Sequence, residues 1–304
     1  MSRQSPKVKI IYRQCREIDL LPAVHLIKAA MVKLRKKTGK PDIPFKIRGV
    51  PPFFSHIRSA NPDLFYCAWK GDKLVGFAGA LVRGRQWFLA WLFVHPSLQD
   101  KGVGRNLLAK VWRDRPGMVH SLCTFAFNMQ AVGLYSKFGM SPLADLPWMK
   151  GDPAKLKKLK TTGLKIIDTH TRDDLKWINN LEKKIRGFSH APEWQHWSRS
   201  DVHRLYIFRN RGKRVGYGMV TKNGQIAPIG VISEKYMLDV ATEMIRLAKP
   251  PAKEKIALWC PTCNMKLYQH LIKIGFRAEE MEIFMSDAPY PDWQRYVPAT
   301  LAVL

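Results

Sequence analysis

The feature that most constrains the fold is an internal repeat, in which the second half of the chain resembles the first. Three pairs of segments match in the same order: 75–79 with 215–219, 128–129 with 264–265, and 137–140 with 273–276. The numbering offset is 140 for the first pair and 136 for the other two. Elements that recur in one order with only small insertions indicate two copies of one domain.

A chain of 304 residues is long enough for two such copies. We expect a first domain at 1–150, a basic linker at 151–162, a second domain at 163–288 and a tail at 289–304. In the first copy, alternating apolar residues and turn residues predict the order β-α-α-β-β-β-α-β-α-β. This order begins with a strand near 7–13, and a Pro-rich loop at 41–52 follows the first helix.

A glycine-rich loop follows the strand-like run that ends at Leu92, Phe93 and Val94. The loop reads Gln99-Asp100-Lys101-Gly102-Val103-Gly104-Arg105, and an amphipathic segment at 106–112 comes directly after it. Backbone amides in a tight loop at a helix N-terminus bind anions, and glycines let the backbone approach a diphosphate closely. The loop is therefore a candidate diphosphate site, although a plain turn before a helix would look the same.

A second motif follows the strand expected at 120–127. Asn128 is suited to cap a helix and Gly139 to end it, which predicts a short helix at 129–138 that carries Tyr135.

Together the two motifs, Gln-x-x-Gly-x-Gly and Asn-x-x-Ala-x-x-Leu-Tyr-x-Lys-Phe-Gly, closely resemble the GNAT superfamily of acyl-CoA N-acyltransferases. The resemblance implies an α+β fold of two GNAT-type domains, each a mixed, mostly antiparallel twisted sheet flanked by helices. It also implies acetyl-CoA as co-substrate. The loop from Gln99 to Arg105 would hold the diphosphate of coenzyme A, the run Leu92–Val94 would contact its pantetheine, and Asn128 would touch the cofactor arm. Tyr135 matches the frequent general acid of the family.

The second copy lacks the residues that carry these motifs. At the offset of 136, the positions of Gln99, Gly102, Gly104 and Tyr135 are taken by Lys235, Leu238, Val240 and Leu271. We therefore expect the second domain to be a degenerate, non-catalytic copy that shapes the acceptor site or covers an open sheet edge of the first. One active site per chain follows.

No general base can be identified from the sequence. A carboxylate would be usual, but no Glu occurs between Glu17 and Glu182. The remaining candidates are ordinary surface or core residues as readily as catalytic ones: His56, Asp63, His95 and His120. Direct transfer without a dedicated base is the other possibility.

The net charge of +27 leaves a second function open. Such a charge attracts polyanions, so a nucleic-acid- or ribosome-associated binding protein with vestigial acyl-CoA binding is the alternative to an enzyme. For an enzyme, the charge disfavours a polycationic acceptor, and a small-molecule or peptide amine fits better. The oligomeric state cannot be read from the chain.

Cysteine content and hydropathy indicate the compartment and the kinds of site to expect. Five cysteines, an odd number without framework spacing, favour free thiols in a reducing, cytoplasmic compartment. No run approaches the ~20 apolar residues of a membrane span, and no membrane partner is expected. Cys260 and Cys263 have C-x-x-C spacing without a partner pair, so no metal is expected. The cluster of His and aromatic residues at 190–203 either lines an acceptor pocket or packs a loop.

Overall fold

The computed structural model describes residues 9–41, 46–169 and 171–304. The chain forms two compact units, and each is described by itself. Unit 1 comprises Met1–Val82 and Trp87–Met118, and unit 2 comprises Arg83–Gln86 and Val119–Leu304. The first part of the strand expected at 7–13 and part of the Pro-rich loop at 41–52 lie outside the described residues.

Unit 1 contains a sheet with the strand order β1-β2-β3-β4. The strands are β1 (Ile10–Gln14), β2 (Phe65–Lys70), β3 (Lys73–Arg83) and β4 (Gln86–Val94). The helices are α1 (Leu20–Lys37), α2 (Pro52–Ala60) and α3 (Val103–Val111). Strands β1 and β2 pair antiparallel, as do β2 and β3, and the consecutive strands β2, β3 and β4 are neighbours in the sheet, which agrees with the three successive strands expected here.

Helices α2 and α3 cover opposite faces of the unit 1 sheet. Phe54 of α2 packs against Phe77 of β3, with ring centroids 5.3 Å apart. The neighbouring residue of β3, Gly76, points the other way, because side chains alternate along a strand. A Cβ on Gly76 would lie 2.7 Å from Leu107 of α3, so only glycine allows α3 to pack this close.

Unit 2 contains a five-stranded sheet built from the second half of the chain. Its order is β13-β10-β9-β8-β7, made of β7 (Lys165–Asp168), β8 (His203–Asn210), β9 (Lys213–Thr221), β10 (Ile226–Val231) and β13 (Tyr296–Val297). The helices are α5 (Arg172–Arg186), α6 (Ala191–Ser198) and α7 (Met237–Leu247). A Cβ on Gly216 of β9 would lie 2.9 Å from Val240 of α7, so the Gly76 packing recurs at the predicted offset of 140.

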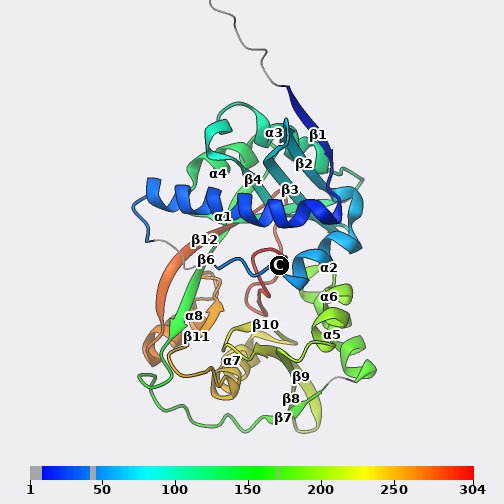
Figure 1. Ribbon diagram of the computed structural model, residues 1–304. Coiled ribbons are helices and arrows are strands. Elements are labelled where there is room, and N and C mark those ends of the chain that lie inside the picture. Colours follow the sequence, from blue (N-terminus) through cyan, green and yellow to red (C-terminus); the bar gives the residue numbers. More distant parts are fainter. Residues whose placement is uncertain (1–8, 42–45, 170) are drawn as a thin grey trace, which may run out of the picture. The chain divides into compact units, whose positions relative to one another are not determined.

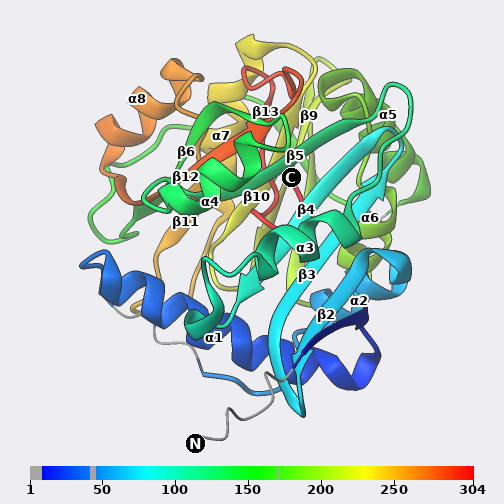
Figure 2. The same ribbon diagram turned by 90° about the horizontal axis from the view of Figure 1, so that it is seen from above.

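The rest of unit 2 is a run of strands in the order β5-β12-β6-β11. These strands are β5 (Val119–Phe125), β6 (Ser141–Gly151), β11 (Ile256–Trp259) and β12 (Arg277–Ser286), with helices α4 (Met129–Ser136) and α8 (Met265–Ile274). Figure 1 shows the long β12, in orange, beside β6, in green, and Figure 2 shows the same strands with α4 and α8. Strands of the two copies therefore alternate, and each copy covers a sheet edge of the other.

The pairing register of β6 and β12 has the symmetry of the repeat. Ser141 pairs with Ser286 at one end and Lys150 with Arg277 at the other, and the offset of 136 exchanges these two pairs. Near the middle, Leu146 pairs with Glu282, which is its own equivalent under the same offset. A pseudo-two-fold axis therefore passes between Leu146 and Glu282.

The expected linker and tail are both packed against unit 2. In the stretch 151–162, Leu156 and Leu159 pack against the core while Lys155 and Lys158 remain exposed. The amide of Thr162 donates to Glu243 of α7 at 2.6 Å. In the tail, β13 pairs with β10, and Val303 and Leu304 are buried. Two leucines thus anchor the basic linker to unit 2, while its lysines remain exposed to solvent.

Candidate functional site

The glycine-rich loop of unit 1 has the geometry of an anion site. Gly102 is the N-cap of α3 and has φ +79°, and Asp100 also has a positive φ of 62°. The left-handed conformation at Gly102 is unfavourable for any residue with a Cβ. It turns the chain so that α3 begins at Val103, and the first N–H groups of a helix have no partner within it. Gly104 and Arg105 lie in this first turn.

The side chains of the loop do not fill the space beside Gly102. Asp100, Lys101 and Arg105 are exposed and Gln99 is half-buried, while a Cβ on Gly102 would meet no atom within 4 Å. The Lys101 ammonium donates to the main-chain oxygen of Ser97 at 3.0 Å, which holds the loop closed. Leu92, Phe93 and Val94 at the end of β4 are half-buried, whereas the start of β4 is buried. The backbone features fit a diphosphate group, since amides and a helix N-terminus bind such a group without side chains.

A cavity of about 680 Å³ lies beside this loop within unit 1. Its apolar lining includes Leu21 and Leu26 of α1 and Leu74 of β3. Four side chains that carry or can carry positive charge also line it: His25, Lys70, Lys73 and His95. Among the described residues that line the cavity none is acidic, so it suits a neutral or anionic molecule better than a polycation.

Asn128 and Tyr135 lie in unit 2, where α4 positions both. The Asn128 side chain accepts a hydrogen bond from the Ala131 amide at 3.4 Å, so Asn128 caps α4 as predicted. Tyr135 is only 6% exposed. Burial raises the pKa of the Tyr135 phenol above its ordinary value, and the nearby Glu282 carboxylate raises it further. Tyr135 is therefore protonated at neutral pH and can donate a proton.

Glu282 is a residue that sequence reasoning missed. It lies on β12, in the second copy, but β12 pairs with β5 and β6 of the first copy. Within the first copy no glutamate follows Glu17, so this carboxylate comes from outside the domain that the motifs define. The offset of 136 could have indicated that β12 pairs with β6, because these two strands are equivalent in the two copies.

Three of the four base candidates from the sequence, His56, Asp63 and His95, lie in unit 1, and the fourth, His120, lies in unit 2 beside Asp287. The His120 ring nitrogen Nδ1 lies 2.6 Å from Asp287, at the start of β5, whereas α4 follows the other end of that strand. His95 is exposed and pairs with Ser97 at 2.8 Å. Asp63 accepts a hydrogen bond from Gln14, and His56 lies in α2 of unit 1. Of the four, only His120 belongs to the same unit as Tyr135.

Among the residues that the structure describes, the second copy has no anion-binding loop like the one before α3. No described residue between β10 and the end of α7 has a positive φ. In α8, the position of Tyr135 is held by the buried Leu271. The backbone of Ile229 and Gly230 in β10 is paired with β13, so the tail covers the strand that corresponds to β4.

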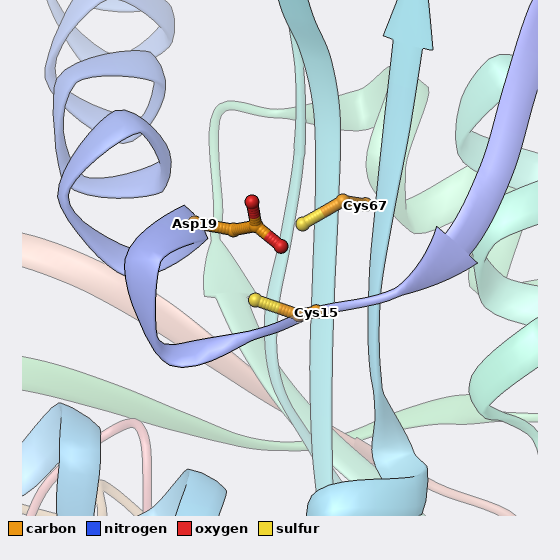
Figure 3. A group of neighbouring side chains, drawn as sticks. All are labelled: Cys15, Asp19 and Cys67. Carbon is orange, nitrogen blue, oxygen red and sulfur yellow. The ribbon is translucent and has the colours of Figure 1, made fainter.

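Cys15, Asp19 and Cys67 of unit 1 bring ligand-type atoms within 4.8 Å of one another, and Figure 3 shows the two sulfurs and the carboxylate pointing together. Both Asp19 oxygens are already used, because Arg13 donates to them at 2.6 and 2.9 Å and the Arg16 amide donates at 2.7 Å. The hydrogen bond to Cys15 and burial raise the pKa of the Cys67 thiol. A metal ion here would have to displace Arg13, so the geometry favours a hydrogen-bonded cluster that fastens β1 to α1.

The other groups singled out by the sequence pack the second copy. Cys260 is buried, Cys263 is exposed, and both are free thiols. In the cluster at 190–203, Glu193 forms a buried ion pair with Arg83, and His190 lies 3.0 Å from Glu182. These contacts support the packing interpretation of the cluster.

The comparisons with known proteins agree with this geometry. The model of the Acetyltransferase (GNAT) family matches residues 30–140. This segment includes the loop at Gln99–Gly104, Asn128 and Tyr135, and it confirms the family resemblance. A search of curated proteins gives no match.

Solved structures show that the GNAT fold extends over the whole chain. A proposed acetyltransferase from Pyrococcus horikoshii has a TM-score of 0.75 at 17% identity, covering 100% of this chain and 99% of that one. A GCN5-related N-acetyltransferase from Sphaerobacter thermophilus has a TM-score of 0.62 at 15% identity, with coverage of 94% and 98%. A tandem GNAT protein from the clavulanic acid biosynthesis pathway has a TM-score of 0.59 at 13% identity, with coverage of 93% and 100%. At these identities the likeness shows the fold alone, which is the mixed, mostly antiparallel fold that we expected.

Within the described residues, no helix is long and apolar enough to cross a membrane.

Proposed function

We propose that this GNAT protein is an N-acetyltransferase that moves an acetyl group from acetyl-CoA to a primary amine. The observation that carries the proposal is the left-handed Gly102 at the N-terminus of α3, because the first amides of a helix have no partner within it and can bind an anion. The first-turn amides of Val103, Gly104 and Arg105 would hold the diphosphate, with Gln99, Asp100 and Lys101 forming the rest of the cradle. Leu92–Val94 would lie along the pantetheine, and Asn128 near the cofactor arm.

The proposed chemistry is direct transfer. The amine nitrogen attacks the thioester carbonyl carbon, the carbon–sulfur bond breaks, and the thiolate takes the phenolic proton of Tyr135. The amine loses one proton to a base. Burial keeps Tyr135 protonated before the reaction, which is the state that a general acid needs.

The acceptor is a small-molecule or peptide amine that is not a polycation. The cavity beside the loop supports this, because its described lining combines apolar residues with lysines and histidines and contains no carboxylate. The overall charge of +27 would repel a polyamine in the same way.

A panel of amines tests the function. Full-length protein is mixed with acetyl-CoA and each amine, and free thiol release is measured. Release with a neutral or acidic amine supports the proposal. Acetyl-CoA binding without release for any amine would contradict it and favour the alternative, a nucleic-acid- or ribosome-associated binder that keeps acyl-CoA binding as a vestige.

We also propose one active site per chain and no resident metal. The second copy lacks the loop and Tyr135, and the tail strand β13 occupies the backbone of its equivalent of β4. The five cysteines are free thiols, which supports a reducing compartment such as the cytoplasm.

A further inference from the structure

We propose that the cavity of unit 1 holds an acidic group of the acceptor, so that the acceptor is an amine with a carboxylate at its other end. The proposal rests on the proposed acetyl transfer and names the class of amine that this transfer would use. Lys70 and Lys73 would bind the carboxylate, and an apolar spacer along α1 would join it to the amine.

Two lysines face each other across the β2–β3 hairpin. Lys70 is the last residue of β2, Lys73 is the first residue of β3, and the two are direct partners in the antiparallel pairing. Like charges that lie directly opposite each other in a strand pair are unfavourable. Among the described residues neither lysine has an ion-pair partner, and both line the cavity. Asp72, the acid between them in sequence, is exposed and is not among the lining residues. A bound carboxylate would offset the repulsion between the lysines.

An apolar strip of α1 lines the same cavity. Leu21 and His25 lie four residues apart, as do Pro22 and Leu26, so the four side chains share one face of the helix. Leu21 is 41% exposed. A spacer of methylene groups that covered Leu21 would remove apolar surface from water. The cavity therefore offers an apolar wall next to two positive charges, which suits a molecule with an apolar body and an acidic end.

A β-bulge adds to this apolar wall. The pairing register of β2 and β3 shifts between Ala68 and Trp69, and the shift leaves Val75 of β3 without an opposite residue. Side chains alternate between the two faces of a regular strand, but the neighbours Leu74 and Val75 both line the cavity. Bulges re-aim side chains in this way and are common beside active sites.

The place of the cavity along the sheet sets the direction of the acceptor. Strands β3 and β4 are neighbours joined by a two-residue loop, so they run antiparallel. The amide of His95, directly after β4, donates to the main-chain oxygen of Val75 at 2.8 Å. Lys73 lies two residues beyond this point, which is about 7 Å along the strand. An acceptor whose amine reaches the thioester beside Leu92–Val94 therefore has its other end at the hairpin lysines.

The lysines of the hairpin are not needed by the cofactor in this arrangement. The described lining of the cavity includes no residue of α3 and none of the loop from Gln99 to Arg105. Main-chain amides at the start of α3 would hold the diphosphate of coenzyme A. Lys70 and Lys73 thus remain available for a second anion.

A matched series of amines tests the proposal. Glycine and ω-amino acids of increasing chain length are compared with alkylamines of the same length that lack the carboxylate, and kcat/KM is measured by free thiol release. We expect the longer ω-amino acids to exceed the matched alkylamines by about tenfold. Glycine should be a poor acceptor, because it is too short to reach both the thioester and the lysines.

Lys70→Met and Lys73→Met, singly and together, remove the charge and keep the apolar stem of each side chain. The double variant should raise KM for the longer ω-amino acids by about tenfold, with kcat, the KM of alkylamines and the acetyl-CoA Kd each within twofold. Its Tm should not fall, because the repulsion between the two lysines is lost. Lys33→Met is the control, since Lys33 is an exposed lysine of α1 that does not line the cavity. It should behave as the wild type.

Equal rates for ω-amino acids and alkylamines in the wild type would overturn this inference and leave the proposed acetyl transfer intact. A double variant with a raised acetyl-CoA Kd and an unchanged acceptor KM would also overturn it, because the cavity would then serve the cofactor. A wild-type protein that binds acetyl-CoA but releases no thiol with any amine would contradict the proposed function, and this inference with it.

Discussion

Asn128 and Asn264 occupy the same place in the two copies of the domain. Each caps a helix, with its side chain accepting a hydrogen bond from the amide three positions on, at 3.4 Å for Asn128 and 3.2 Å for Asn264. The helix after Asn128 carries Tyr135, whereas the helix after Asn264 carries Leu271 at the equivalent position. The helix cap is thus present in both copies, whereas the tyrosine proposed as the general acid is present in one.

Tyr135→Phe should lower thioester turnover by about 10²–10⁴ without changing acetyl-CoA affinity, because phenylalanine keeps the buried ring and loses only the acidic proton. Steady-state kinetics and calorimetric titration would measure the two effects. Tyr268→Phe in α8 is the control and should turn over at the wild-type rate. Equal rates for all three proteins would remove Tyr135 from the mechanism.

Gly102→Ala should weaken acetyl-CoA binding and cost about 1–2 kcal/mol of folding free energy, because alanine is strained in the left-handed region. Gly212→Ala is closely matched, since Gly212 also has φ +79° and open space around its Cα. We expect both variants to lose similar stability in urea denaturation, but only Gly102→Ala to lose affinity. A similar affinity for acetyl-CoA in both variants would argue against an anion site at the Gly102 loop.

Acetyl-CoA should bind with a stoichiometry of one per chain. The second copy lacks the loop, and the β10 backbone is paired with β13. Isothermal titration of the wild-type protein checks the number. A second binding event that survives Gly102→Ala would show that the second copy has kept a site.

The Arg83–Glu193 ion pair should make stability depend on pH. Burial raises the pKa of Glu193, but the hydrogen bonds and charge of Arg83 outweigh it, so the net pKa lies below its ordinary value. The contribution of a group with a lowered folded pKa is complete above its unfolded pKa of about 4.3. It is lost as the pH falls through the folded value.

Glu193→Gln should therefore cost about 3–5 kcal/mol at pH 7, because it removes the carboxylate that neutralises the buried Arg83 charge. The difference from wild type should shrink below pH 4. Urea denaturation at a series of pH values measures both. A constant difference from pH 7 to pH 3 would contradict the assigned linkage.

The charge of +27 predicts weak, sequence-independent binding to nucleic acid that falls steeply with salt. We expect amine acetylation to be unaffected by added duplex DNA or RNA at 0.15 M salt. Fluorescence anisotropy across a salt series, run beside the kinetic assay, checks both points. Tight binding that persists at high salt, in a protein without transferase activity, would favour the alternative function.

Much of the first copy could be predicted because its signals are local. The β2–β3–β4 meander, the α3 start at Gly102 and the Asn128 cap depend on residues within a few positions of one another. The helix predicted at 129–138 ends at Ser136, and a turn through Gly139, which has φ +89°, follows it. Helix ends depend on such short-range hydrogen bonds, so the predicted end lies close to the observed one.

The sequence by itself determined the repeat, its offset, the loop at Gln99–Gly104 and the position of Tyr135. Only the tertiary structure decided that β12 lies between β5 and β6 and so places a strand of the second copy, with Glu282, between two strands of the first. The physical reason is that helix caps and turns are set by neighbours in sequence, whereas strand pairing is set by burial over long separations. The residues of a strand indicate that it pairs with other strands, but they do not indicate which copy of the domain those strands belong to.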